Sequence, residues 1–200
     1  MGVKYIKILL AAAMLLFSLV VSGCGEDKLV GSWYMVPQFD ENAALGDPNC
    51  YVQVKIEKGD DGYLVSKTSY AYWYVDEKIN KSNKKVAEYD LSFVFGKFFT
   101  VFADEAVELN DDDKLVVKRP YSTVYTYEYD DKNDTLVENL KNHKGRLRMV
   151  FKKESKEDIQ KFKEKCRHAL EEKYRPGTKT DEFWNGIGIT SKIKSIKFLN

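Results

Sequence analysis

Apolar and polar positions follow one another in three different patterns along the 200-residue chain. Residues 8–21 form an apolar run that is broken only by Ser18. Between residues 29 and 153, apolar residues often occupy every second position, a period typical of half-buried β-strands. Between residues 159 and 174 they return every three or four positions, as on one face of a helix. The pattern predicts an N-terminal leader, residues 1–23, and one mainly β domain, residues 29–200, that carries a single helix.

Short strands separated by acidic or glycine-containing turns account for most of the expected domain. Gly59-Asp60-Asp61-Gly62 predicts a hairpin turn, since glycine and aspartate tolerate positive φ angles. A mostly polar stretch, residues 76–85, is expected to end the strand that precedes it. The expected strands are residues 52–56, 65–75, 86–95, 98–102, 115–118, 122–129, 135–139 and 146–152, with a first strand that carries Gly31-Ser32-Trp33 and a last one within residues 187–198. Many short antiparallel strands at this spacing indicate a barrel or a sandwich.

The helix is expected over residues 155–174. Ser155, with Asp158 three residues later, approximates an N-terminal capping pattern in which aspartate replaces the usual glutamate. Pro176-Gly177 ends the helix. The apolar face of this helix consists of Ile159, Phe162, Cys166, Leu170 and Tyr174. Cys166 is therefore expected on the inward side.

The first part of the chain has the features of an export signal. Lys4 and Lys7 precede an apolar run shorter than the about 20 residues of a membrane span, as in a secretory signal peptide. Val21-Ser22-Gly23-Cys24 resembles a bacterial lipobox, which implies cleavage before Cys24, a diacylglyceryl group on its thiol and an acyl chain such as palmitate on its amine. The resemblance implies a lipoprotein anchored by residues 24–28 to the extracytoplasmic side of the cell membrane or the outer membrane. The alternative is an ordinary signal peptide with a chance cysteine.

Charge and cysteine content narrow the class of protein. Of the 32 basic and 31 acidic side chains, only Lys4 and Lys7 precede Cys24, so the mature chain carries a net charge of −1. This balance argues against a nucleic-acid partner, which favours a strongly basic protein. Cys50 and Cys166 are the other two cysteines, and outside the cytoplasm a pair of thiols usually oxidises. A Cys50–Cys166 disulfide is expected where the fold brings the two residues together.

The expected first strand carries a second resemblance. Gly31-Ser32-Trp33 resembles the Gly-x-Trp signature of lipocalins and lipocalin-like bacterial lipoproteins, and strands followed by a helix and a last strand occur there in a similar order. The resemblance implies an up-and-down antiparallel barrel of about 8–10 strands with a C-terminal helix. It also implies that Trp33 closes the barrel floor and that a basic residue, Arg146 or Arg148, stacks on it. An unrelated β-sandwich or meander is the alternative fold.

Aromatic residues on the expected strands suggest two functions. A wall suited to a small hydrophobic or amphiphilic ligand would consist of Trp73, Phe93, Phe95, Tyr125, Tyr127 and Met149. The same residues can instead fill the core, since large apolar side chains are usually buried. Tyr70, Tyr72 and Tyr74 share the other face of their strand, where they would cover a groove under the helix or bind a protein partner. The sequence thus predicts an envelope ligand-binding protein or, alternatively, an interaction or inhibitor module with a filled barrel.

Catalytic and metal-binding patterns find little support, and neither an enzyme nor a bound cofactor or metal is expected. The chain has two histidines, His143 in an expected turn and His168 on the helix face opposite Cys166. It contains neither a Gly-x-Ser-x-Gly elbow nor a phosphate-binding glycine loop. The acidic clusters at residues 111–113 and 130–134 are expected to be solvated turns, because the latter lacks the glycine and final glutamate of a calcium loop.

Overall fold

The computed structural model describes residues 27–43, 47–82, 86–179 and 190–199. The expected leader and Cys24 lie outside these residues. The described part is mainly β, as predicted, with one nine-stranded sheet and one helix. No helix in this part is both long enough and apolar enough to cross a membrane. The elements are β1 (Gly31–Met35), β2 (Tyr51–Gly59), β3 (Gly62–Ser82), β4 (Val86–Val107), β5 (Leu115–Arg119), β6 (Thr123–Asp130), β7 (Thr135–Asn142), β8 (Gly145–Lys153), α2 (Asp158–Lys173) and β9 (Thr190–Leu199).

The sheet curls but does not close into the expected barrel. Its strand order is β5-β6-β7-β8-β1-β2-β3-β4-β9, and every pair is antiparallel except β4 with β9, which is parallel. Within the described residues, the ion pair of Glu105 with Arg119 joins β4 to β5, and the isolated bridge Leu109–Leu115 lies at the connection between the two strands. A groove separates the two strands beside these contacts and is lined in part by Val107 and Val116. A closed barrel needs a continuous ladder at this seam, so the predicted closure is wrong.

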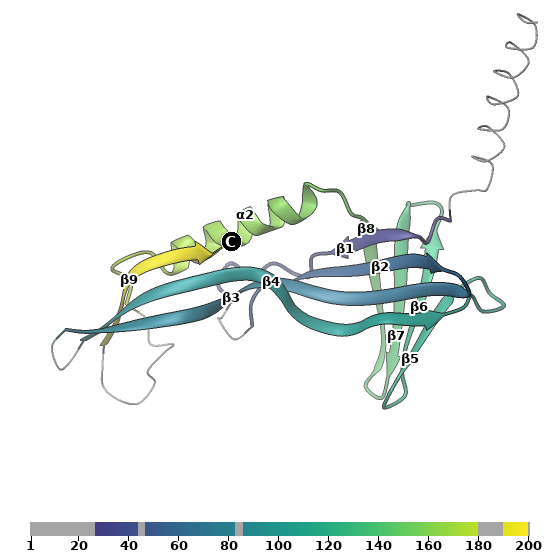
Figure 1. The fold of residues 1–200 in the computed structure, drawn as a ribbon, viewed down its shortest axis with the longest axis horizontal. Helices are drawn as coiled ribbons and strands as arrows, with labels where there is room; N and C mark the ends of the chain where they lie inside the picture. The colour runs from purple at the N-terminus through teal and green to yellow at the C-terminus, as the bar shows by residue number, and fades with distance from the viewer. Residues whose placement is uncertain (1–26, 44–46, 83–85, 180–189, 200) are drawn as a thin grey trace, which may run out of the picture.

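The long hairpin of β3 and β4 gives the molecule its two regions. β3 has 21 residues and β4 has 22, and their pairing runs from Tyr63–Val107 to Ser82–Val86. The predicted end of the first strand near residue 76 is therefore wrong, and the two strands expected over 86–102 are one. We call β1, β2, β5–β8 and the adjoining residues 62–68 and 100–107 the body. The rest of β3 and β4, with β9 and α2, is the arm, which extends away from β5–β8 (Figure 1).

Two hydrophobic cores lie on opposite faces of this sheet. The pairing of β2 with β3 is regular, so alternate side chains point to opposite faces. Val54 and Val65 contribute to the body core, on the side enclosed by β5–β8. Tyr51 and Tyr72 contribute to the arm core, on the side that α2 covers (Figure 1). Each region thus buries a different face of the same strands.

The helix forms as its spacing predicts, although it begins at Asp158, three residues after the predicted start. The Asp158 carboxylate accepts a hydrogen bond of 2.7 Å from the Ser155 backbone N–H, which is one half of the capping pattern. Phe162, Cys166 and Tyr174 are buried in the arm core, on the predicted face. The chain then returns as β9, so the predicted final strand is present from Thr190; residues 187–189 lie outside the described part.

Candidate functional site

The Gly31-Ser32-Trp33 motif contributes Trp33 to the body core. Trp33 is fully buried, and its Nε1 donates a hydrogen bond of 2.9 Å to the Leu29 carbonyl. Lys153 Nζ lies 4.7 Å from the centre of the Trp33 ring and donates to the Val30 carbonyl at 2.9 Å. A Cβ atom on Gly31 would lie 2.9 Å from Lys153 Nζ. Gly31 also has a φ of 138°, which other residues rarely adopt, so both the backbone and the lysine that crosses it favour glycine at this position.

The basic residue on Trp33 is therefore Lys153, and the expectation of Arg146 or Arg148 is wrong. Alternate residues of β8 face opposite sides of the sheet, and Phe151 faces the body core. Lys153 shares that parity and pairs directly with Trp33 across the strands. Arg146 and Arg148 have the other parity and are exposed on the outer face.

The six residues expected to line one ligand pocket lie in three separate places. Tyr125 and Tyr127 are buried in the body core, and Met149 packs against it. Phe93 and Phe95 belong to the arm core under α2. Trp73 lies on the arm but on the opposite face of the sheet, since it pairs with Val94. The pocket does not assemble, because alternation divides these residues between the two faces.

A buried ion pair occupies the body interior in place of a ligand. Lys67 Nζ lies 2.6 Å and 2.7 Å from the two carboxylate oxygens of Glu138, and the Tyr127 hydroxyl donates to the same carboxylate at 2.6 Å. Lys67 is 6% exposed and Glu138 is 0% exposed. Lys67 Nζ also lies 5.1 Å from the ring centre of Tyr125 and 5.7 Å from that of Phe151. The interior is therefore occupied by mutually satisfied side chains.

The electrostatics of this cluster follow from its burial. Desolvation lowers the pKa of Lys67, while the Glu138 carboxylate opposes that effect. The pKa of Tyr127 is raised well above its ordinary value, first by burial and then by the charge and hydrogen bond of Glu138. Tyr127 therefore remains a neutral donor. The sequence analysis did not predict this pair. The available signal was position: Lys67 is two residues after buried Val65, and Glu138 is two residues after buried Leu136, so each lies on a core-facing side of its strand.

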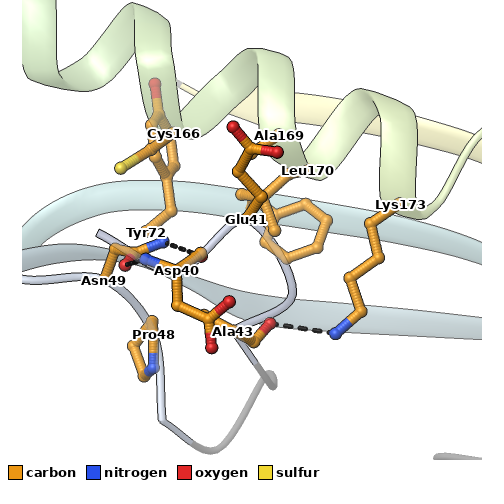
Figure 2. Close-up of a pocket in the computed structure, with 11 residues that line it drawn as sticks. Asp40, Glu41, Ala43, Pro48, Asn49, Tyr72, Cys166, Ala169, Leu170 and Lys173 are labelled. Atoms are coloured by element: carbon orange, nitrogen blue, oxygen red, sulfur yellow. Dashed lines mark hydrogen bonds between the residues drawn. The ribbon is translucent and has the colours of Figure 1, made fainter. Parts of the chain in front are cut away.

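A small cavity lies beneath α2 (Figure 2). Its volume is about 30 Å³, which is the share of one water molecule in the liquid. Asp40 and Asn49 close one side by exchanging hydrogen bonds of 2.8 Å and 2.7 Å. Lys173 Nζ donates to the Ala43 carbonyl at 2.9 Å on the other side. This cavity is too small for an organic ligand.

Cys50 and Cys166 both carry free thiols in the structure, so the expected disulfide is not present. Burial raises the pKa of Cys166 to about 12, with a further contribution from the charge of Cys50. Burial also raises the pKa of Cys50, and its Sγ lies 3.3 Å from the Pro48 carbonyl. Pro48 and Asn49, which directly precede Cys50, line the same cavity as Cys166, so the fold brings the two cysteines into the same neighbourhood.

A β-bulge exposes aromatic side chains on the arm. Ser69 pairs with Phe99 and Tyr70 pairs with Lys97, so Phe98 is the extra residue between these pairs. In a bulge, two residues oppose one on the partner strand and the local twist increases. Phe98 is 43% exposed and Phe99 is 60% exposed.

Trp73 adjoins Phe98. The Trp73 ring lies over Gly96, where a Cβ atom would approach it to 2.9 Å, and its centre is 6.4 Å from that of Phe98. Val75, which is 46% exposed, is the extra residue of a second irregularity, between the pairs Tyr74–Phe93 and Asp76–Ser92. We call Trp73, Val75, Phe98 and Phe99 the aromatic face. By strand parity, Trp73 lies on the side of the sheet away from α2.

The tyrosines expected to form a protein-binding patch lie on the other side of the arm. Tyr72 is buried in the arm core and Tyr70 packs against it, so the expectation of a groove under the helix describes these two. Tyr74 is 40% exposed. The uncovered surface is instead the aromatic face, which strand alternation alone could not distinguish from a core.

Comparison with family models, with curated proteins and with solved structures finds no match for this chain. Within residues 27–43, 47–82, 86–179 and 190–199, no three histidine, cysteine, aspartate or glutamate side chains are arranged to hold a metal ion. The aromatic face is therefore the candidate binding surface of the described residues.

Proposed function

We propose that this protein is a lipid-anchored envelope protein that binds another protein through its aromatic face. The observation that carries the proposal is the exposure of Phe98 and Phe99 where the Trp73 ring packs beside Phe98, with Val75 exposed farther along β3. Large apolar side chains gathered on one surface favour a protein interface, where aromatic residues are enriched. The β-bulge supports this reading, because it turns two consecutive aromatic residues outward instead of one.

The filled interior of the body favours an interaction module over a ligand carrier. Lys67, Glu138 and Tyr127 satisfy one another where a lipocalin-like barrel would hold its ligand. A hydrophobic ligand there would have to displace a buried ion pair, and breaking such a pair costs about 3–5 kcal/mol. We also propose that the chain is related to lipocalins, as Gly31 and Trp33 suggest, with a barrel that is open and an interior that is packed.

The proposed anchor sets how the protein would be presented. Only four residues separate Cys24 from Leu29, which is buried in the body core. Four extended residues span at most about 14 Å. The body would therefore lie next to the bilayer, and the arm would carry the aromatic face away from β5–β8. Intact-mass measurement on the native product tests the anchor: an uncleaved leader or a Cys24 without lipid contradicts it.

In-cell photo-crosslinking tests the proposed interface. A photoreactive phenylalanine analogue replaces Phe99 in the full-length protein, and a matched control carries it at Glu164, an exposed position of α2. We expect a discrete protein adduct from position 99, absent from position 164 and weakened when Val75→Ser is added. Equal adducts from both positions, or none from position 99, would contradict a protein partner at this face.

A further inference from the structure

Charge is segregated between the two ends of β5–β8. The acidic turns at residues 111–113 and 130–134 lie before β5 and between β6 and β7. The opposite end of the same strands consists of the β5–β6 turn and the β7–β8 turn. Its basic side chains are Lys118, Lys141, Lys144 and Arg146. Because the strands are antiparallel, the acidic and basic turns are separated by the whole length of β6 and β7.

The basic end concentrates like charge in one row. Lys118 pairs with Val124, Val124 with Lys141, and Lys141 with Arg146, so the three cationic residues lie on one line across four strands, with Val124 between the first two and with Lys141 and Arg146 directly opposite each other. Like charges directly opposite each other destabilise a strand pair. Residues 139–153 contain no acidic residue. In the described part of the chain, Lys118, Lys141 and Arg146 form no salt bridge, whereas neighbouring Arg119 pairs with Glu105.

An exposed aromatic residue lies at the same end. Tyr121, in the β5–β6 turn, is 89% exposed. It has a φ of 60° and Ser122 has a φ of 56°, left-handed values that glycine and asparagine adopt more readily than tyrosine and serine. Each such residue costs about 1 kcal/mol or more. The turn therefore presents a tyrosine ring to solvent where glycine would be more stable.

We propose that this basic end, with Tyr121 at its tip, binds an anionic glycan of the cell envelope. Lysine and arginine side chains would meet carboxylate or phosphate groups spaced along the polymer, and the tyrosine ring would stack on a sugar. The row from Lys118 to Arg146 spans about 14 Å at the usual strand spacing, which suits a linear chain. This surface is separate from the aromatic face.

The position of the basic end argues against the protein's own membrane as its partner. The described chain begins at Asp27, and Lys28 forms an ion pair with Asp131 in the acidic β6–β7 turn. The eight residues of β6 place the basic end about 27 Å from that turn. This step rests on the proposed anchor at Cys24, which would hold the acidic end toward the bilayer.

Binding measurements on the purified full-length protein test the proposal. Oligogalacturonate is the anionic glycan probe, neutral dextran the uncharged one, polyphosphate the anion without sugar rings, and vesicles of phosphatidylglycerol the lipid surface. We expect binding to oligogalacturonate that weakens with salt, and weaker or no binding to the other three. Tighter binding to the vesicles or to polyphosphate would overturn the proposal in favour of a lipid surface or of simple charge attraction.

Three variants locate the site. Lys141→Glu with Arg146→Glu should weaken glycan binding by about tenfold or more, whereas the same charge change at Lys192 and Lys194 on β9 should not. Tyr121→Gly removes the ring at a backbone position that glycine prefers. It should raise thermal stability and weaken glycan binding about fivefold, the scale of one aromatic contact. Unchanged binding by Tyr121→Gly, or equal loss from the β9 control, would overturn the proposal, whatever the outcome of crosslinking at Phe99.

Discussion

The body and the arm use the same long strands and bury them in different ways. In the body, β5–β8 fold back over β2–β4, so one sheet encloses its own core around Trp33 and Phe151. In the arm, a helix covers one face, with Phe162 and Cys166 as its buried residues, and the other face carries Trp73 and Phe98 in partial contact with solvent. A sheet that curls covers one face of its strands without help. A sheet that extends needs another element for each face, and among the described residues this arm has one, α2.

The largest loss of stability should follow the removal of one charge from the body core. Glu138→Leu leaves Lys67 buried without its partner and should lower the free energy of unfolding by about 3–5 kcal/mol. Lys67→Met combined with Glu138→Leu replaces the pair by apolar side chains and should restore most of that loss. Urea unfolding measures both. A single variant that loses less than about 1 kcal/mol would show that the pair is not desolvated as the structure indicates.

A second prediction asks whether the two regions unfold together. Phe162→Ala removes a buried ring from the arm core and should cost about 3 kcal/mol or more. Hydrogen exchange should then lose protection in α2 and β9 while β6 and β7 remain protected. Phe151→Ala is the matched change in the body core and should weaken protection in both regions. Uniform loss of protection in Phe162→Ala would mean that body and arm form one cooperative unit.

A third prediction separates the two candidate partners of Trp33. Lys153→Met keeps the aliphatic stem over Gly31 and removes the charge from the indole, which should cost about 1 kcal/mol. Arg148→Met removes a charge from the exposed outer face and should change stability by less than about 0.5 kcal/mol. Thermal unfolding compares the two variants. A larger effect from Arg148→Met would restore the original expectation.

The smallest change in stability is expected in the reduced protein at alkaline pH, where the Cys166 thiol of the arm core titrates. The pKa of Cys166 is about 12 when folded, against about 9 when exposed, so the folded chain keeps a proton that the unfolded chain releases. Its contribution to stability is therefore complete below about pH 9 and declines as the pH rises toward 12. Cys166→Ala should flatten this decline in urea unfolding more than Cys50→Ala, because Cys50 is only half-buried. Equal slopes for the two variants would contradict the assignment to Cys166.

Cys50 and Cys166 are free thiols in the structure, and the disulfide expected from the sequence is a prediction for the exported, oxidised protein. Exchange with an oxidised dithiol catalyst would form the Cys50–Cys166 bond, break the catalyst's disulfide and leave the two thiol protons on the catalyst's sulfurs. We expect oxidised protein, purified from an exported source, to lack the mass of two hydrogens and to recover it on reduction. Free thiols after export would show that burial of Cys166 protects it from exchange.

Alternation made most of the local structure predictable and left the three-dimensional closure open. The apolar period placed Val52, Val54 and Ile56 on one buried face, and the helical spacing placed Phe162 and Cys166 inward, as the structure shows. The extension of β3 to Ser82 was not predictable in this way, because polar residues 76–82 form a strand only when β4 supplies their partners. Whether β4 meets β5 depends on the accumulated curl of nine strands, which no local pattern contains.

The candidate site shows the same limit. Strand alternation predicted that Trp73 and Tyr72 lie on opposite faces of the sheet. It did not predict which face is buried, because that depends on where α2 packs. Parity applied to β8 would also have excluded Arg148 as the partner of Trp33 and selected Lys153. The ion pair of Lys67 and Glu138 required knowing that β3 and β7 face each other across the body.

The positions of α2 and β9 after every strand of the body set the order in which the two regions can fold during synthesis. Every strand of the body precedes residue 154, so the body can assemble as soon as that segment has emerged. The arm depends on α2 and β9, which begin at Asp158 and Thr190, for its helix and its edge strand. Until they arrive, Tyr72 and Phe93 have nothing to cover them, and a nascent or partly exported chain displays on that side the kind of surface that chaperones hold.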